Sequence, residues 1–255
     1  MKAIPIKPLA EWSDATAYEY TQGHDSALWA WQFLRRNSEY RRDWVQFYTT
    51  WQSLEEAYGK APKRDFSRWK NDPRAYADQG LCEGLEEEAG FGCAGDGGKL
   101  LIECWLGAKW GFYKFPLNPE YAQPKVGEEL LWREVELQAV RLSVQRCAAY
   151  LDSDCTLAFG FDLSLPLKEQ LALVKRELQQ QKRQQREAIR CQTVQGLAAR
   201  WLLMLRVLDA SGAGIEAAQI SAALALDVVS LRNLQQQAEA LRDGAYRQML
   251  LLAER

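Results

Sequence analysis

The sequence is poor in the residues that metal centres and many enzymes need. Its 255 residues include a single histidine, His24, and its six cysteines form no C-x-x-C pair. Zinc sites need clustered imidazoles or thiolates, and the common catalytic triads need a positioned histidine. We therefore expect no metal, no cofactor and no enzymatic activity.

Short motifs of catalysis and phosphate binding are also lacking. No G-x-S-x-G or H-E-x-x-H pattern occurs. In the glycine-rich stretch 92–99, Cys93 stands where a phosphate-binding loop needs its first glycine. Leu100 stands where that loop needs serine or threonine. A flexible entry to a hairpin explains the stretch better than a nucleotide site.

Long hydrophobic runs are missing. The longest, such as Trp201–Leu205, fall far below the roughly 18 residues that cross a bilayer. The N-terminus has no apolar region typical of a secretory signal. Without an export signal, most of the cysteines are expected to be reduced packing residues. The sequence predicts a soluble, cytoplasmic protein with no membrane partner.

Neither sign of charge dominates, but the charges are unevenly distributed. The chain has 32 basic and 34 acidic residues, a net charge of −2. Residues 164–255 contain 13 basic and 9 acidic side chains, so residues 1–163 form an acidic body. A mildly basic tail weakly favours an anionic partner for that part of the chain.

The first 60 residues are rich in aromatic side chains and predict helices. Asp25-Ser26 is suited to cap a helix over 27–36, and Asn37-Ser38 precedes a second helix that Gly59 ends. Aromatic residues can stack on nucleobases, but a stripe at helical spacing is more typical of a core, so we interpret this face as core. It comprises Tyr40, Trp44, Phe47, Trp51, Leu54 and Tyr58.

The middle of the chain predicts a small sheet. Residues 79–99 contain seven glycines and are expected to form a loop or an insertion. The segments 99–105 and 109–115 alternate or run apolar around Leu106-Gly107-Ala108, which is the pattern of a β-hairpin. Residues 156–162 predict another strand. We expect three or more strands, packed by the N-terminal aromatic residues.

After Pro166 the pattern is helical to the end. Between Lys168 and Arg190 the chain has seven basic residues, three acidic residues and six glutamines. An apolar stripe in the first half of this helix gives way to glutamine, which is typical of a connector or arm. Its basic residues form either a solvated face or a set of phosphate contacts. The stripe consists of Leu167, Leu171, Val174 and Leu178.

Three further helices follow, over 194–210, 215–226 and 228–241, with Asp227 as the N-cap of the third. Short helices joined in this way predict a helix-turn-helix, with or without a short wing. The inward residues of the third helix should be Leu231, Leu234, Ala238 and Leu241.

The predicted fold class is α+β and mainly helical. An N-terminal domain of helices and a small sheet, 1–165, would serve assembly or regulation. A basic, glutamine-rich connector helix would span 166–193, and an all-α helix-turn-helix-like DNA-binding domain would span 194–255.

The third helix carries side chains suited to reading bases. Arginine pairs with guanine, while asparagine and glutamine pair with adenine. The outward candidates are Ser230, Arg232, Asn233, Gln236 and Gln237. Candidates for phosphate contacts are Arg200, Arg206, Arg242 and Arg247. Residues 194–255 have six basic and six acidic groups, so one such module should bind DNA weakly.

Four segments carry a further signal. They are, in order, Trp29–Trp44 (WAWQFLRRNSEYRRDW), Asp162–Leu171 (DLSLPLKEQL), Arg200–Ala210 (RWLLMLRVLDA) and Leu241–Leu252 (LRDGAYRQMLLL). Together they resemble proteobacterial transcriptional regulators that join an N-terminal domain with a FLRRNPEYR-type motif to a C-terminal DNA-binding domain. The RovC-type activators of type VI secretion genes, which assemble as hexamers, share this pattern.

Residues and resemblance together predict a bacterial transcription factor. It would be a sequence-specific, DNA-binding, oligomeric activator of secretion-system or mobile-element genes. The expected partners are double-stranded promoter DNA, further copies of the chain held mainly by residues before Pro166, and RNA polymerase. The resemblance implies a hexamer. The alternative is a non-enzymatic adaptor that uses a helix-turn-helix-like bundle to bind another protein.

Overall fold

A computed structural model describes residues 10–78, 99–135, 159–184 and 193–252. The chain divides into two compact units, one formed by residues 1–135 with 200–251 and the other by 136–199 with 252–255. The helices of the described residues are α1 Ser26–Leu34, α2 Ser38–Tyr58, α3 Phe66–Trp69, α6 Ile102–Trp110, α8 Leu167–Gln184, α10 Val194–Gly212, α11 Ala217–Leu224 and α12 Val228–Arg242. Short 3₁₀ helices are η1 Ala15–Thr21, η2 Pro73–Ala75 and η3 Ala245–Leu251.

The two predicted N-terminal helices are confirmed as α1 and α2. Asp25 caps α1 by accepting a hydrogen bond from the Leu28 amide, and Asn37 caps α2 by accepting from two amides. α2 ends at Gly59, whose φ of 85° is a conformation that favours glycine. The caps that the sequence suggested therefore set the bounds of both helices.

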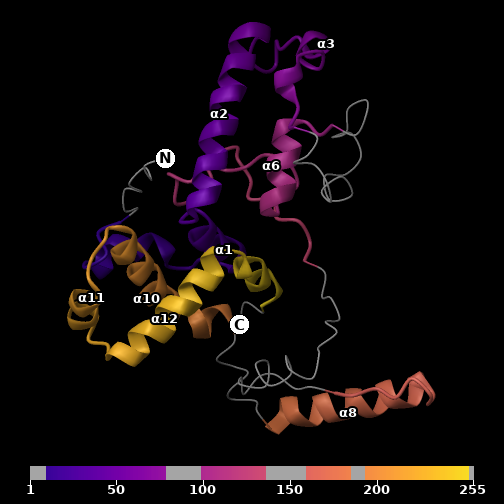
Figure 1. The fold of residues 1–255 in the computed structure, drawn as a ribbon, viewed down its shortest axis with the longest axis vertical. Coiled ribbons are helices and arrows are strands. Elements are labelled where there is room, and N and C mark those ends of the chain that lie inside the picture. Colours follow the sequence, from indigo (N-terminus) through magenta and orange to yellow (C-terminus); the bar gives the residue numbers. More distant parts are fainter. Residues whose placement is uncertain (1–9, 79–98, 136–158, 185–192, 253–255) are drawn as a thin grey trace. The chain divides into compact units, whose positions relative to one another are not determined.

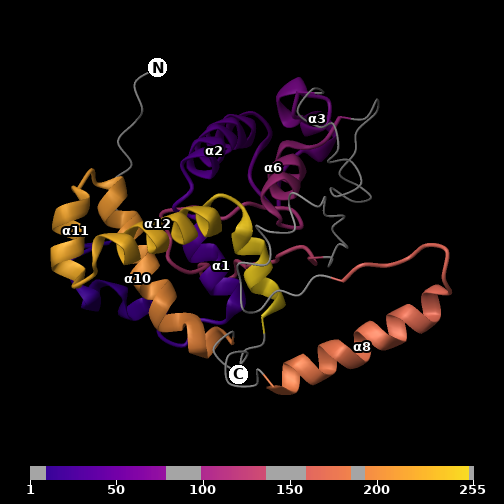
Figure 2. The same cartoon turned by 60° about the horizontal axis from the view of Figure 1, so that its bottom comes forward.

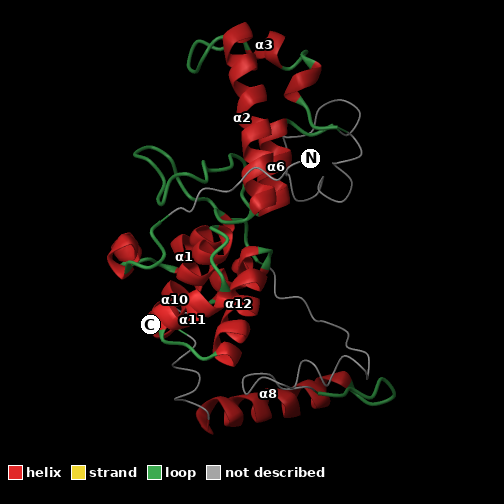
Figure 3. Ribbon diagram, turned by 60° about the vertical axis from the view of Figure 1, so that its left-hand side comes forward, coloured by secondary structure: helices red, strands yellow, loops and turns green. Residues whose placement is uncertain are grey.

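The predicted small sheet is wrong for the described residues. They contain no strand, and only isolated bridges join Tyr76 to Leu101 and Phe112 to Trp132 (Figure 3). The expected hairpin is instead the helix α6, and its expected turn at Gly107 lies inside that helix. Of the other predicted strand, residues 159–162 form none and the rest lie outside the described residues. The described part of the molecule is therefore helical rather than α+β.

The environment of α6 explains this error. Most of its residues are buried, so the helix has no polar face and shows no helical period in its sequence. Gly107 lies against a neighbouring loop, and a Cβ placed there would come within 2.3 Å of the Lys114 carbonyl oxygen. The glycine that suggested a turn is thus needed for close packing of a helix. α6 lies beside α2 (Figures 1 and 2).

The core of the first unit joins both ends of the chain. α1 packs against α12 and η3, and the rings of Trp29 and Trp201 lie 5.4 Å apart. Both tryptophans are buried, as are Phe33 and Leu205. The N-terminal aromatic residues therefore pack on C-terminal helices rather than on a sheet. Figure 2 shows α10 and α12 beside α1, with α11 farther out.

Only one cysteine lies in the described residues. Cys104 is fully buried in α6 and is disulfide-bonded, so it departs from the expected reduced state. The other five cysteines, and all but one residue of the predicted loop 79–99, lie outside the described residues.

In the second unit, the helix expected after Pro166 is α8. The Gln170 side chain fastens the chain that precedes this helix. Its oxygen accepts a hydrogen bond from the Asp162 amide at 2.9 Å, and its nitrogen donates to the Asp162 carbonyl at 2.8 Å. These bonds fix the segment that leads into α8.

Candidate nucleic-acid interface

α11 and α12 are joined by a short, well-defined turn. Ala225 adopts a left-handed conformation with φ 52°, and the Leu226 amide donates back to the Ser221 carbonyl at 3.0 Å. Asp227 then caps α12 by accepting from the amides of Val229 and Ser230, each at 2.9 Å. α12 therefore begins at its own cap directly after a tight turn that follows α11.

Packing fixes which side of α12 faces solvent. Leu231, Leu234 and Ala238 are buried as predicted, and Leu241 is half-buried. Ile220 of α11 is buried as well. Every predicted base-reading side chain consequently lies on the exposed edge of α12: Ser230, Arg232, Asn233, Gln236 and Gln237.

These five side chains differ in what they contact. Arg232, Asn233 and Gln236 have no hydrogen-bonding or ionic partner among the described residues. The Ser230 hydroxyl donates to the Asp227 carboxylate and completes the helix cap. Gln237 accepts a hydrogen bond from Arg200 at 2.6 Å. Three polar side chains on one edge are thus available to a ligand without breaking a contact.

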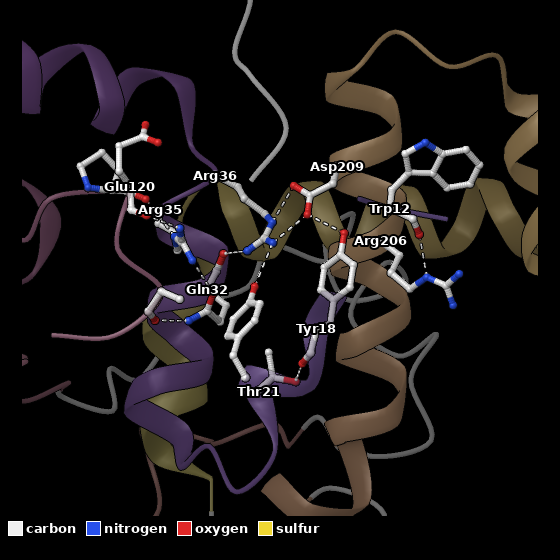
Figure 4. Close-up of polar contacts among 12 residues, drawn as sticks. Trp12, Tyr18, Thr21, Gln32, Arg35, Arg36, Glu120, Arg206 and Asp209 are labelled. Atoms are coloured by element: carbon white, nitrogen blue, oxygen red, sulfur yellow. Dashed lines mark hydrogen bonds and ion pairs between the residues drawn. The ribbon is translucent and has the colours of Figure 1, made fainter. Parts of the chain in front are cut away.

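The four predicted phosphate-contacting arginines are not brought together. Arg200 is exposed and lies beside α12 through its bond to Gln237. Arg206 donates to the carbonyl oxygens of Trp12 and Ser13, each at 2.8 Å (Figure 4). Arg242 pairs with Asp243, its neighbour in sequence. Of this set, Arg200 is the one positioned next to the candidate base-reading edge.

Arg247 lies against α6. A Cβ placed at Gly111 would come within 2.9 Å of the Arg247 Nε, so the guanidinium packs over that glycine. The neighbouring Tyr246 hydroxyl donates to the Trp110 carbonyl at 2.9 Å. Arg247 therefore helps to hold η3 on α6.

A buried ion pair connects α1 to α10. The Arg36 side chain donates two hydrogen bonds to Asp209, at 2.9 and 2.7 Å, and the two side chains are only 4% and 5% exposed (Figure 4). Tyr18 donates to the same carboxylate at 2.7 Å. Burial and the Asp209 charge raise the pKa of Tyr18, so its hydroxyl stays protonated and remains a donor. This network fixes the C-terminal helices to the N-terminal segment.

The preceding arginine holds a loop. Arg35 donates to the carbonyl oxygens of Pro119 and Glu120 at 2.9 and 3.0 Å, and Gln32 donates to that of Ala122 at 2.7 Å (Figure 4). Burial lowers the pKa of Arg35 to about 10, so it stays charged at neutral pH. The buried Pro119 carbonyl oxygen thereby has a hydrogen-bond donor, and the loop 119–122 is held against α1.

Asn37 serves two elements at once. Its oxygen caps α2, and its nitrogen donates to the Arg242 carbonyl at 3.2 Å and to the Asp243 carboxylate at 3.0 Å. The stretch 33–37 therefore lies at the junction between α1, α2 and the end of α12. Sequence reasoning used Asn37 to mark the start of the second helix, but it used Arg35 and Arg36 only for the resemblance. In the sequence, the feature that could have indicated this structural role is the pair Arg35-Arg36 directly after an apolar helix.

A second feature of the first unit is an aromatic cleft of about 560 Å³. Tyr40, Phe47 and Leu54 of the predicted stripe are buried, whereas Trp44 and Trp51 line this cleft. The rest of its wall includes Tyr48, Tyr113, Phe115 and Tyr121. Of the six stripe residues, Tyr40 and Leu54 are thus core only, whereas Trp44, Phe47 and Trp51 line a surface hollow.

The described residues offer neither a metal-binding cluster nor a helix that could cross a membrane. No group of three or more histidine, cysteine, aspartate or glutamate side chains there could hold a metal ion. In the same part of the chain, no helix is long and apolar enough to cross a membrane.

The comparison with known proteins concerns the N-terminal part of the chain. Residues 11–69 match the family model described as a proteobacterial transcriptional regulator-like domain. No curated protein and no solved structure matches the chain. The matched segment spans η1 to α3 and includes Arg35, Arg36 and Asn37. This similarity supports a role in transcription regulation.

Proposed function

We propose that this protein is a non-enzymatic, sequence-specific, DNA-binding transcription regulator whose α12 enters the major groove. The observation that carries the proposal is the exposed edge of α12, where Arg232, Asn233 and Gln236 lie without partners in the described residues. Their side chains can make the paired hydrogen bonds that distinguish guanine and adenine. The regulator-like match at 11–69 supports the same role, because that segment packs against α12.

Arg200 supplies the first phosphate contact in this proposal. It lies beside α12, whereas Arg206 and Arg247 pack on other segments of the first unit and Arg242 pairs with its neighbour Asp243. Few free arginines give a single copy little affinity, because phosphate neutralisation supplies much of the binding energy. Specific binding therefore uses several copies on one duplex, which can raise apparent affinity by about 10²–10⁴. The resemblance extends this proposal in three ways: the protein activates secretion genes, assembles as a hexamer and contacts RNA polymerase.

The direct test is fluorescence anisotropy with promoter fragments from the source genome. The wild-type protein should bind at about 50 mM salt and lose affinity steeply toward 200 mM. Arg200→Ala should weaken binding to all fragments alike, because a phosphate contact carries no base information. Arg42→Ala is the matched control, since Arg42 is an equally exposed arginine that belongs to α2 and not to the helices α10 to α12.

The adaptor function has one observation in its favour. Val228 and Val229 at the start of α12 are each 68% exposed, and apolar side chains suit a protein partner. If no fragment binds at about 50 mM salt, DNA binding fails and the adaptor function takes its place. Replacement of both valines by serine should then abolish capture of the partner.

A further inference from the structure

The helix of the second unit, α8, has an apolar stripe that is open to solvent. Leu167, Leu171 and Leu178 are 55%, 49% and 45% exposed, and Val174 between them is partly exposed. Leu171, Val174 and Leu178 form a continuous apolar strip along one face of the helix. An amphipathic helix normally buries such a stripe against a partner. The stripe, which we call the α8 seam, has none in the chain as described.

The spacing of the α8 seam identifies the kind of partner it fits. Its residues follow steps of four, three and four, which is the heptad spacing of a coiled coil. Leu171 and Leu178 take the a positions, and Leu167 and Val174 take the d positions. Such a seam packs against another seam with the same spacing, and an identical helix offers one.

The charges that flank the seam select an orientation. Lys168 and Lys175 occupy successive e positions, and Gln170 and Glu177 occupy the g positions. In an antiparallel pair that aligns all four apolar residues, Lys168 of each helix lies opposite Lys175 of the other, so two lysine pairs repel each other. A parallel pair instead places each Lys175 beside a neutral Gln170.

We propose that α8 pairs in parallel with α8 of another copy of this chain. The sequence alone favours assembly through residues before Pro166, whereas the open seam and its flanking charges assign self-association to this helix. Like most homo-oligomers, such an assembly uses the same surface on each copy. The inference does not depend on DNA binding, because self-association is measured without DNA.

Light scattering on the full-length chain at tens of micromolar measures the mass. The wild-type protein should have at least twice the mass of one chain. Leu171→Asp combined with Leu178→Asp should reduce it to that of one chain, because carboxylates would enter the seam. Leu173→Asp is the matched control: Leu173 is 63% exposed but lies off the seam, so the assembly should persist.

Three results would overturn the proposal. The wild-type chain could be a monomer, or the double variant could keep its assembled mass. In the third result, wild type and double variant are both monomers, and the double variant unfolds at a lower temperature. That result would show that the seam packs within its own chain.

Orientation has a separate test. In Leu167→Cys, a parallel pair brings the two new thiols together, so mild oxidation should give a dimer on a non-reducing gel beyond the wild-type background. An antiparallel pair would instead cross-link Leu167→Cys only with Leu178→Cys in a mixture of the two variants. That second result would contradict the parallel arrangement.

Discussion

At the residue scale, the Arg36–Asp209 pair is the most consequential polar contact between the two ends of the chain. Both side chains are almost fully buried, and Tyr18 and the Gln32 carbonyl oxygen satisfy further hydrogen-bonding groups of the pair. Burying two charges is expensive, so such a pair tolerates the loss of one partner poorly. The cost of that loss measures how firmly α10 is held to the N-terminal segment.

Asp209→Ala should lower the free energy of unfolding by about 3–5 kcal/mol, because it leaves the Arg36 charge buried without a counterion. Denaturant titration measures this change. Glu120→Ala is the control, since Glu120 is 58% exposed in its pair with Arg41 and should contribute at most about 1 kcal/mol. Equal effects of the two variants would contradict the role assigned to the buried pair.

Glu103 is a buried carboxyl with an oxygen that has no hydrogen-bond partner. Burial raises its pKa, so folding favours the protonated form. The contribution of Glu103 to stability is therefore greatest at a pH below the pKa that this carboxyl has in the unfolded chain. That contribution is lost as the pH rises through the pKa of the same carboxyl in the folded protein. Glutamine should suit this position better at neutral pH.

Glu103→Gln should accordingly raise the free energy of unfolding at pH 7 by about 1 kcal/mol, the size of one unsatisfied buried group. The gain should vanish near pH 3, where the protonated Glu103 of the wild type is as neutral as the glutamine of the variant. Glu39→Gln is the control, because that carboxylate is exposed and pairs with Lys109. A Glu103→Gln gain that is the same at both pH values would refute the titration of this carboxyl.

At the element scale, the helix caps were predictable and the burial of whole elements was not. Asp25, Asn37 and Asp227 each precede a helix that begins where the sequence indicated. Caps act over three residues, so one sequence contains the full signal. α6 was missed because its residues are buried nearly all round, and the helical period disappears when no face is polar.

A substitution at Asn37 can separate its two roles, the cap of α2 and the contact with the end of α12. Asn37→Asp keeps the cap of α2 but replaces the donor to Arg242 and Asp243 by a carboxylate beside a carboxylate, so stability should fall by about 1–3 kcal/mol. Asp227→Asn is the reverse exchange at the cap of α12, where the side chain acts only as an acceptor, and it should change little. Thermal unfolding of both variants measures the difference. A neutral Asn37→Asp would show that the contact with the end of α12 is unimportant.

At the scale of the whole molecule, the segment that matches the regulator family shares a core with the C-terminal helices. Its α1 packs on α12 and η3, and Trp29 packs against Trp201. The regulator-like segment and the candidate reading helix thus share one hydrophobic core. A change in the N-terminal helices can reach α12 through these contacts.

The candidate site could be predicted only in part, because some of its residues contact segments that are distant in sequence. The inward register of α12 follows from local spacing, and its exposed edge follows from that register. The role of Arg206 could not be predicted, because its partners Trp12 and Ser13 lie more than 190 residues away in sequence. An arginine that looks free in sequence can therefore be committed to a distant carbonyl group.

Base preference tests the central proposal most directly. Duplexes bound by the full-length protein would be selected from a randomised pool at about 50 mM salt, for the wild type and for Arg232→Ala, Asn233→Ala and the control Arg42→Ala. The wild type and the control should enrich the same motif, and each α12 variant should lose preference at its own position, worth about 1–3 kcal/mol per base contact. No enriched motif, or one motif shared unchanged by all four proteins, would contradict base reading by α12.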